Sequence, residues 1–253
     1  MITNNGVMDI PKIQQAGSLK GKRVIVRASL NVPIEAHQVA DDFRLKRAMM
    51  TIEYLIKKQA KIILIGHIGR DPQETLRPVA NYFNRRGSIK MGFVPDLEES
   101  IAEDMIHNMP NGSVILLQNL RRYPGEKKND AAFSKKLASL ADVYVNDAFS
   151  VSHRKHASIV GLPKYLPSFA GLLFQDEVKH LKMALAPKHP FLFILGGAKT
   201  ETKMPLLKKF SKLADSVLVG GAIANDLLQA RGVEVGKSVV GKNIKGLSTF
   251  AKQ

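Results

Sequence analysis

Apolar residues in the N-terminal part of the chain follow two alternating patterns. Short runs that are almost entirely apolar, such as residues 61–65 (KIILI), predict buried strands. Longer stretches with apolar residues at every third or fourth position, such as residues 43–59, predict amphipathic helices. Together these patterns predict strands at residues 23–27, 61–65, 90–93, 114–117 and 143–145, and helices at residues 43–59, 75–86, 97–107 and 130–141.

The alternation of strands and helices predicts an α/β fold. Strands that are apolar along their whole length, separated by amphipathic helices, are typical of a mostly parallel sheet covered on both faces. Ligands of such sheets bind outside the carboxyl ends of the strands. We therefore expect a binding site at this edge of the sheet. The polar residues that follow the strand ends are Asn31, His67 with Arg70, Arg121, and Asn146 with Asp147.

A second unit is predicted after a long helix at residues 167–186, which can connect two domains. Strands at residues 191–195 and 216–219 each run into a glycine pair and then into a helix. Such turns are typical of nucleotide-binding Rossmann-like sheets, but the strands are too few to complete one. We therefore expect two Rossmann-like parallel-sheet domains joined by a long helix, the second domain incomplete. The expected boundaries are 1–166, 167–187 and 188–253.

Composition and charge narrow the class of protein. The 253 residues are 45% hydrophobic, enough for a sizeable core, and the lack of cysteine excludes disulfides, thiolate ligands and a cysteine nucleophile. The formal net charge of +16 favours anionic partners: nucleic acid, an acidic membrane surface or phosphorylated metabolites. Most lysine pairs, however, fall on predicted outer helix faces, where a solvated basic surface is the simpler interpretation.

The sequence shows no sign of membrane insertion or export. No apolar run is long enough to cross a bilayer. Residues 1–12 lack the basic start and apolar middle of a secretory signal. We therefore expect a cytoplasmic protein that does not span a membrane.

Two short motifs combine histidine and arginine. Residues 67–70 (HIGR) place an imidazole and a guanidinium around a glycine, directly after a buried strand. This arrangement fits anion capture, or equally a turn in which His67 caps a neighbouring element. Residues 150–156 (SVSHRKH) carry two histidines at a spacing that metal sites use, but no HExxH pattern or carboxylate partner accompanies them. We favour phosphate or carboxylate binding there over metal.

The glycine-rich turns of the second unit point to phosphate binding. Residues 196–199 (GGAK) lack the Walker spacing, yet they offer free backbone N–H groups and a lysine close to a helix start. Lys203 follows one helical turn after Lys199 and can point the same way. Glycine pairs also serve packing alone in tight turns, and the pair at residues 220–221 is the weaker signal.

Seven blocks of the sequence, read together, resemble the phosphoglycerate kinase family in that family's order and approximate spacing. The resemblance runs from about residue 23 to residue 240, and it covers the N-terminal domain and the first part of the C-terminal nucleotide domain. The blocks are RASLNVP, DDFRLKRA, ILIGHIGR, NLRRYPGEKKND, LASLADVYVNDAFSVSHRKHAS, ILGGAKTETK and VLVGGAIA.

The resemblance implies a phosphotransferase of glycolysis and gluconeogenesis. Such an enzyme moves a phosphoryl group reversibly between 1,3-bisphosphoglycerate and ADP, giving 3-phosphoglycerate and ATP. It implies that residues 1–166 bind 3-phosphoglycerate, that 167–187 form an interdomain helix and hinge, and that 188–253 are part of a nucleotide-binding domain. It further implies Mg²⁺ bound with ADP or ATP, and a monomer. We expect no tightly bound protein metal and no membrane partner, and a nucleic-acid partner is not favoured.

The resemblance also assigns roles, position by position. Arg44 and Lys203 are the implied catalytic residues: Arg44 stabilises the transferring phosphoryl group, and Lys203 faces the nucleotide phosphates. The implied substrate-binding residues are Ser29, Asn31, Arg44, His67, Arg70, Arg121 and Arg154. The implied nucleotide-binding residues are Gly197, Ala198, Lys199, Lys203, Gly220 and Gly221.

Three departures from the family pattern bear on function. Ser29 and Gln118 replace an aspartate and a glutamate of the family, so the cleft is expected to be more positive. The family's later nucleotide-site glycines, its acidic residues for nucleotide and magnesium, and its C-terminal segment have no counterpart, which predicts a fragment or a truncated homologue. One alternative function is therefore binding of phosphoglycerate-like anions without transfer. A basic nucleic-acid-binding module is less favoured, because zinc-finger, RNP and GXXG patterns are absent.

Overall fold

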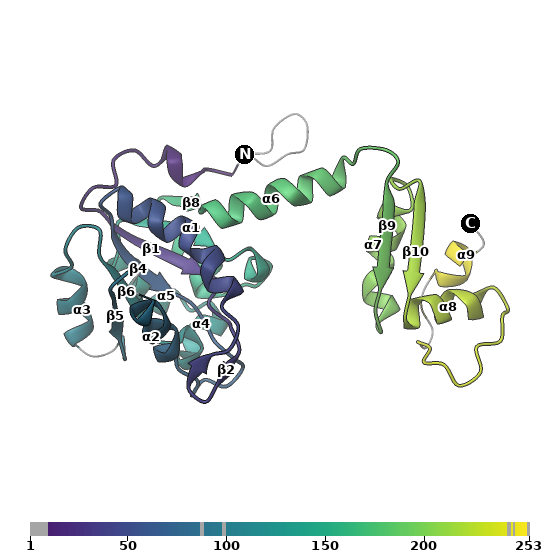
Figure 1. Ribbon diagram of the computed structural model, residues 1–253, viewed down its shortest axis with the longest axis horizontal. Helices are drawn as coiled ribbons and strands as arrows, with labels where there is room; N and C mark the ends of the chain where they lie inside the picture. Colours follow the sequence, from purple (N-terminus) through teal and green to yellow (C-terminus); the bar gives the residue numbers. More distant parts are fainter. Residues whose placement is uncertain (1–9, 87–88, 98–99, 242–243, 245, 252–253) are drawn as a thin grey trace. The chain divides into compact units, whose positions relative to one another are not determined.

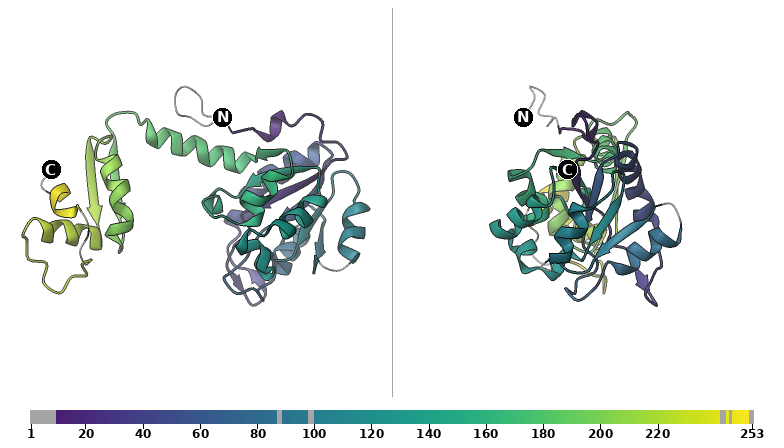
Figure 2. Two further views of the ribbon diagram at one scale, coloured as in Figure 1. Left: turned by 180° about the vertical axis from the view of Figure 1, so that it is seen from behind. Right: turned by 90° about the vertical axis from the view of Figure 1, so that its left-hand side faces the viewer.

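The structure is a computed structural model that describes residues 10–86, 89–97, 100–241, 244 and 246–251. The chain divides into two compact units, Met1–Val178 and Lys179–Gln253, and each is described by itself (Figures 1 and 2). The division falls within helix α6 (Leu172–Leu185). The three-part division expected from the sequence stays a prediction, and most of the residues on which the export prediction rests lie outside the described ranges.

The N-terminal unit is built on a six-stranded parallel sheet in the order β5-β6-β4-β1-β7-β8. β1 lies inside the sheet between β4 and β7, so that Arg27 stands in register with Ile65 and Asn146. The predicted α/β fold with a parallel sheet is confirmed. The strands are β1 (Arg23–Ala28), β4 (Lys61–Ile65), β5 (Met91–Val94), β6 (Val114–Leu117), β7 (Val143–Asp147) and β8 (Ser168–Ala170).

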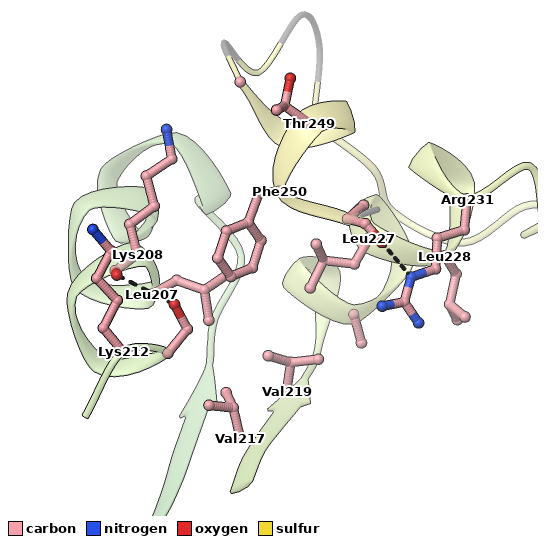
Figure 3. Close-up of a pocket in the computed structure, with 14 residues that line it drawn as sticks. Leu207, Lys208, Lys212, Val217, Val219, Leu227, Leu228, Arg231, Thr249 and Phe250 are labelled. Carbon is pink, nitrogen blue, oxygen red and sulfur yellow. Dashed lines mark hydrogen bonds between the residues drawn. The ribbon is translucent and has the colours of Figure 1, made fainter. Parts of the chain in front are cut away.

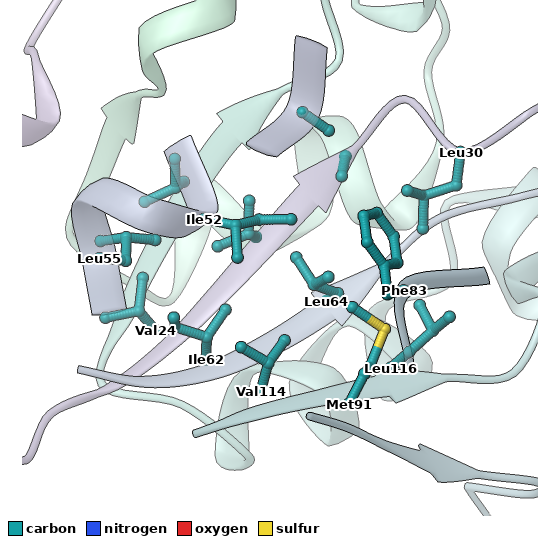
Figure 4. Packing of buried hydrophobic residues seen from close by; sticks show 14 of the residues in the cluster. Val24, Leu30, Ile52, Leu55, Ile62, Leu64, Phe83, Met91, Val114 and Leu116 are labelled. Carbon is teal, nitrogen blue, oxygen red and sulfur yellow. The ribbon is translucent and has the colours of Figure 1, made fainter. Parts of the chain in front are cut away.

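Alternate residues of the strands fill two apolar cores on opposite faces of this sheet. Val24 and Ile62 belong to the first core, where they pack with side chains of α1 and α2 (Figure 4). Ile25 and Ile63, the next residue on each strand, belong to the second core, with side chains of α3 and α5. Because both faces are buried, the central residues of these strands are mostly apolar. The helices of this unit are α1 (Phe43–Lys57), α2 (Arg77–Arg85), α3 (Ser100–His107), α4 (Pro124–Lys128) and α5 (Ala131–Ser139).

The predicted helix at residues 167–186 begins later than expected. Residues Ser168–Ala170 pair with β7 as the edge strand β8, and the helix starts only at Leu172. At Gly171, between them, a Cβ atom would lie 2.2 Å from Asp147 Oδ1, so only glycine fits without displacing that carboxylate. Residues 168–170 therefore form the edge strand of the sheet. This is a tertiary contact, which the helical spacing of apolar residues does not reveal.

Several short elements were not predicted. A hairpin of β2 (Ile34–Glu35) and β3 (Gln38–Val39) turns through two residues at positive φ, Ala36 and His37, so it carries no glycine signal. The predicted helix at 97–107 is observed from residue 100, and residues 98–99 lie outside the described ranges. Single helical turns lie at Ile13–Gln15, Leu120–Arg122, Phe149–Val151, Ala157–Gly161 and Leu162–Lys164.

The C-terminal unit contains a two-stranded parallel sheet of β9 (Leu192–Gly196) and β10 (Ser216–Gly220). Two helices, α7 (Thr200–Phe210) and α8 (Ala222–Ala230), share an apolar core with one face of that sheet, and the short α9 (Leu247–Ala251) contributes to it. The predicted strand–glycine–helix order is therefore confirmed. Within the described part of the chain, no helix is both long and apolar enough to cross a bilayer.

The opposite face of the two-stranded sheet is apolar and exposed. Leu192, Ile194 and Leu218 are 49%, 67% and 55% exposed, whereas Leu195, the next residue along β9, is 7% exposed. Side chains alternate along a strand, and Ile194 is in register with Leu218, so the exposed residues share one face. Such a patch is typical of a surface that further protein covers. This agrees with a second domain that is incomplete.

Replacing Ile194 by lysine is expected to change the stability of the C-terminal unit by less than about 0.5 kcal/mol, because this side chain already lies largely in water. The same replacement at Leu195 should unfold the unit, because it buries a charge in the core. Fluorescence of the dye ANS reports both: Ile194→Lys should lower it and Leu195→Lys should raise it. Unchanged ANS fluorescence of Ile194→Lys would contradict an exposed apolar face.

Candidate functional site

The carboxyl edge of the six-stranded sheet carries the candidate site. His67 follows β4, Arg121 follows β6 and Arg154 follows β7, so the parallel pairing brings their loops to one edge. Arg121 and Arg154 also lie close enough to His67 for their charges to lower the pKa of its ring. The structure therefore brings together three of the predicted substrate-binding residues.

Arg27, near the end of β1, lies beneath these residues and is only 1% exposed. Its Nε donates to Ser158 Oγ at 3.1 Å, and its Nη1 donates to the carbonyl oxygen of Ala28 at 2.6 Å. Its Nη2 lies 2.7 Å from His67 Nδ1. Burial lowers the pKa of Arg27, while nearby Glu126 raises it. A guanidinium is thus held in the interior, in direct contact with a predicted ligand residue.

Glu126, in α4, supplies the buried negative charge that offsets Arg27. It is 1% exposed, and its Oε2 accepts from Ser158 N at 2.9 Å. Its Oε1 accepts from Ser158 Oγ at 2.6 Å and lies 3.6 Å from His156 Nδ1. Burial lowers the pKa of His156, whereas Glu126 raises it. Because an unpaired buried charge is strongly destabilising, we expect Glu126 to keep Arg27 inside the fold.

His67 acts at this site as a neutral ring. Its side chain is buried, and burial, followed by the charges of Arg27, Arg121 and Arg154, lowers its pKa to about 3. The ring therefore carries no charge at neutral pH, and it can offer an N–H donor to a ligand but no net positive charge.

The positive charge that faces outward comes from three arginines. Arg121 and Arg154 are half-buried, and Arg70 is exposed. Burial lowers the pKa of Arg121, and the charges of Arg154 and Arg70 lower it further, while Glu74 raises it. Guanidinium groups this close together repel one another, so they favour a ligand with several negative charges. We refer to Arg27, His67, Arg70, Arg121 and Arg154 as the basic cluster.

Asn119, which is fully buried, joins two loops of the cluster. Its Oδ1 accepts from Ile68 N at 3.3 Å and from Arg121 N at 3.2 Å. Its Nδ2 donates to the carbonyl oxygens of Ile68 and Glu74 at 3.1 and 2.8 Å. Arg121 Nη1 in turn donates to the carbonyl oxygen of Gly69. The HIGR loop and the loop after β6 are therefore fixed to each other by side-chain hydrogen bonds to the backbone.

Asn31 links this loop to α1. Its Oδ1 accepts from Gly69 N at 2.8 Å, and its carbonyl oxygen accepts from Arg44 Nη1 at 3.0 Å. Arg44 is exposed at the start of α1. Ser29, two residues before Asn31, is half-buried and brings no carboxylate to this position. Asn31 therefore contacts the HIGR loop, and Arg44 contacts Asn31; their predicted roles in binding stay a prediction.

Gln118 accepts hydrogen bonds from residues at the start of α2. It is 4% exposed, and its Oε1 accepts from Thr75 Oγ1, Leu76 N and Asn119 N at 3.1, 3.1 and 2.8 Å. A neutral amide oxygen can accept these bonds as a carboxylate would. Gln118 therefore contributes to the packing of α2, and the expected gain of positive charge in the cleft stays a prediction.

In the C-terminal unit the two glycine turns lie against each other. Gly197 O accepts from Ile223 N at 3.4 Å, and a Cβ atom on Gly221 would lie 3.2 Å from the same oxygen. A Cβ on Gly197 would lie 4.0 Å from Lys203 Cε. Lys199 is exposed at the N-cap of α7. The structure thus places Lys203 and both glycine turns together, with Ala198 exposed in the first turn and Gly220 preceding the second.

A buried carboxylate in α8 connects this helix to the start of α7. Asp226 in α8 is 2% exposed, and its Oδ2 accepts from Thr200 Oγ1 at the start of α7. Its Oδ1 accepts from Gly241 N at 2.6 Å. Asn225 Nδ2 donates to the carbonyl oxygen of Val239 at 3.0 Å. The segment before residue 241 is therefore tied to α8 directly and, through Asp226, to the start of α7.

A cavity of about 960 Å³ in this unit is lined by residues of α7, β10, α8 and α9 (Figure 3). Val217, Val219, Leu227 and Phe250 form its apolar walls, and Lys208, Lys212 and Arg231 also line it. The cavity adjoins the C-terminal ends of α7 and α8, and its lining also includes Val219 and Ala224, on either side of the second glycine turn.

Among the residues that the structure describes, no group of three or more histidine, aspartate and glutamate side chains could hold a metal ion. Magnesium that arrives with a nucleotide needs few protein ligands, because phosphate oxygens and water complete its coordination. The described residues are therefore compatible with a magnesium–nucleotide complex as substrate.

The sequence predictions missed Arg27, Glu126, Asn119 and Asp226. Arg27 had a detectable signal, because an arginine inside a strand of a buried parallel sheet needs a partner. Glu126 had no such signal, because it lies in a segment rich in charged residues, a composition that indicates exposure to solvent. Asn119 and Asp226 show their roles only through contacts between segments distant in sequence.

Comparisons with known proteins agree with the resemblance. A model of the family described as phosphoglycerate kinase matches residues 13–253. The chain is similar to phosphoglycerate kinases from Wolbachia sp. subsp. Drosophila simulans (44% identity over 236 residues, 91% of this chain and 59% of the relative) and from Dictyoglomus turgidum (46% identity over 231 residues, 88% and 57%).

The structure of phosphoglycerate kinase from Coxiella burnetii is also similar. It superposes with a TM-score of 0.82 at 32% identity, covering 97% of this chain and 62% of that protein. The chain thus spans between 57% and 62% of the length of these three relatives.

Proposed function

The chain belongs to the phosphoglycerate kinase family, and we propose that it takes part in reversible phosphoryl transfer between 1,3-bisphosphoglycerate and ADP. The products are 3-phosphoglycerate and ATP. On the resemblance we also propose a monomer that acts in the cytoplasm. The observation that carries the proposal is the basic cluster at the carboxyl edge of the six-stranded sheet.

The basic cluster suits a small molecule with a phosphate and a carboxylate. Arg121, Arg154 and Arg70 supply guanidinium forks for anionic oxygens, and His67 supplies a neutral donor. Asn31 and Asn119 hold the loops that carry these groups. We assign 3-phosphoglycerate to this site, with Ser29 beside it in place of the family carboxylate.

The glycine turns of the C-terminal unit suit nucleotide phosphates. Exposed backbone N–H groups at a helix start attract anions, and Lys199 and Lys203 add positive charge beside them. We assign Mg-ADP or Mg-ATP to these turns, with Gly197, Ala198, Gly220 and Gly221 lining the phosphates. Charge that develops on three equatorial oxygens of the phosphoryl group in transit is the kind that Arg44 and Lys203 can stabilise.

Binding without transfer is the second candidate. The C-terminal unit has a two-stranded sheet with one exposed apolar face, and the chain spans about 60% of its relatives' length. A chain of this extent can hold the acid in its N-terminal unit and still lack groups that transfer requires. A coupled assay with 3-phosphoglycerate and Mg-ATP distinguishes the two candidates by the presence or absence of turnover.

Titration calorimetry with two variants tests the ligand assignments. Arg121→Ala should weaken binding of 3-phosphoglycerate about 10- to 100-fold, the range for loss of a charge-assisted hydrogen bond, and leave Mg-ATP binding unchanged. Lys203→Ala should weaken binding of Mg-ATP by a similar factor and leave 3-phosphoglycerate binding unchanged.

Arg23→Ala is the matched control for Arg121→Ala. Arg23 pairs with Asp142 at 2.8 Å, at the amino end of β1 and therefore away from the cluster, so neither ligand should bind more weakly. Loss of both ligands in one variant would contradict the assignment of one ligand to each unit. No binding of 3-phosphoglycerate by the unaltered chain would refute the proposed substrate site.

A further inference from the structure

Three buried side chains, Glu126, Ser158 and Arg27, form a continuous hydrogen-bonded connection that ends on His67. Glu126 Oε1 accepts from Ser158 Oγ, Ser158 Oγ accepts from Arg27 Nε, and Arg27 Nη2 lies 2.7 Å from His67 Nδ1. Glu126, Ser158 and Arg27 are each no more than 1% exposed, so water does not compete for these contacts.

The direction of every hydrogen bond in this connection is fixed by chemistry. Arginine stays protonated and has only donors, and an ionised glutamate has only acceptors. Ser158 must therefore give its single proton to Glu126 and receive the Arg27 Nε–H. By the same reasoning Arg27 Nη2 donates, so His67 Nδ1 must be the acceptor. A neutral histidine whose Nδ1 accepts carries its proton on Nε2.

Glu126 is the charge that keeps Arg27 in place. Arg121 and Arg154 repel the Arg27 guanidinium, and Tyr144 and Glu126 favour its charged form. Tyr144 is a neutral phenol that donates to Ser158 O at 2.7 Å, so Glu126 supplies the compensating charge. Ser158 is held on both sides, by Tyr144 at its carbonyl and by Glu126 at its amide. The carboxylate therefore acts on His67 without touching it.

We propose that Glu126 is a positioning residue that, through Ser158 and Arg27, holds His67 in the tautomer with its proton on Nε2. His67 then offers a substrate anion one N–H donor of fixed identity, while the net charge of the cluster comes from its arginines. The tautomer follows from this geometry alone. Its use in binding rests on the proposed function, which places His67 in the 3-phosphoglycerate site.

Nitrogen NMR of the histidine side chains tests the proposal on the whole 253-residue chain. The chain has seven histidines, and a His67→Gln variant identifies the signals of His67. In the unaltered protein we expect an unprotonated Nδ1, a protonated Nε2 and no protonation of the ring down to pH 5. Glu126→Gln, which keeps the shape and removes the charge, should release Arg27 and give a mixture of both tautomers.

The matched control is Asp130→Asn, four residues further along the same segment. Asp130 is exposed and its Oδ1 accepts from Phe133 N at 2.8 Å, a bond that asparagine also accepts, so the tautomer of His67 should not change. Ser158→Ala provides a second test, because it breaks the connection while both charges stay. It should also populate the second tautomer, even if Glu126→Gln does not fold.

A single Nε2-protonated tautomer in folded Ser158→Ala, or in folded Glu126→Gln, would overturn the proposal. The affinity for 3-phosphoglycerate provides an independent readout: it should fall about tenfold in Glu126→Gln, the factor for one weakened hydrogen bond. If the tautomers mix as expected but the unaltered chain binds no 3-phosphoglycerate, the positioning role stands and the proposed function fails. If binding is intact and the tautomer never changes, the proposed function stands and the positioning role fails.

Discussion

Replacement of Arg44 by alanine is expected to slow phosphoryl transfer about 10³-fold while leaving the affinity for 3-phosphoglycerate nearly unchanged. The Arg44 guanidinium is exposed and donates to the carbonyl oxygen of Asn31. The buried contacts of the basic cluster instead centre on Arg27, His67 and Arg121. An arginine outside those contacts can stabilise charge that develops during transfer without contributing to ground-state binding.

The coupled assay and calorimetry must be combined, because the prediction concerns the difference between rate and affinity. Lys46→Ala is the matched control: Lys46 lies on the same helix, is exposed and pairs with Asp42, so both readings should stay within error. If Arg44→Ala weakens 3-phosphoglycerate binding as much as it slows transfer, Arg44 belongs to the binding cluster. A normal rate of transfer in Arg44→Ala would show that the assigned role is wrong.

Much of the fold was predictable because the buried strands are short apolar runs. Lys61–Ile65 and Val114–Leu117 begin and end where the pattern places them, since both faces of this sheet are covered. The edge strand Ser168–Ala170 was not predictable, because three residues have no period of their own and depend on pairing with β7. Local pattern therefore predicted the elements whose burial is continuous, and missed the edge strand that depends on a neighbour.

The candidate site divides in a similar way. His67 and Arg121 were found because they follow apolar strands, where a parallel sheet exposes its ligands. Glu126 was not found, because its burial depends on the approach of α4 to residues 157–161. The charge state of His67 could also not be predicted from the sequence alone. That state depends on burial and on three neighbouring arginines, all distant in sequence or on other loops.

Asp147 is a further buried carboxylate, and it is placed where α6 begins. It ends β7, is 1% exposed, and its Oδ1 accepts from Phe174 N at 3.1 Å. Burial raises the pKa of Asp147 to about 6, against hydrogen bonds from Thr51 and the amides of Phe174 and Leu173, and against the charge of Arg47. Arg47 itself pairs with Asp176 of α6 at 2.6 Å. The fold therefore holds an acid whose charged form is disfavoured.

Replacement of Asp147 by asparagine is expected to remove a pH-dependent loss of stability of about 3 kcal/mol. In the unfolded chain Asp147 releases its proton near pH 4, whereas in the fold it keeps the proton up to about pH 6. The fold thus binds more protons in this window, and its stability falls as pH rises through it. The variant cannot acquire this charge, so its free energy of unfolding should rise relative to the unaltered chain by up to about 3 kcal/mol between pH 4 and pH 7.5.

Tyrosine fluorescence during urea unfolding measures this difference in the N-terminal unit alone, because all five tyrosines lie in it and the chain has no tryptophan. His67 contributes with the opposite sign, since its lowered pKa makes stability fall as pH drops below about 6.5, but this contribution is common to both proteins and cancels.

Asp142→Asn is the control of opposite sign. Burial would raise the pKa of Asp142, but its bonds with Arg23 lower it, so that variant should lose more stability at pH 7.5 than at pH 3, by no more than about 1 kcal/mol because the pair is partly exposed. A difference between Asp147→Asn and the unaltered chain that stays constant from pH 4 to pH 7.5 would mean that Asp147 titrates normally in the fold.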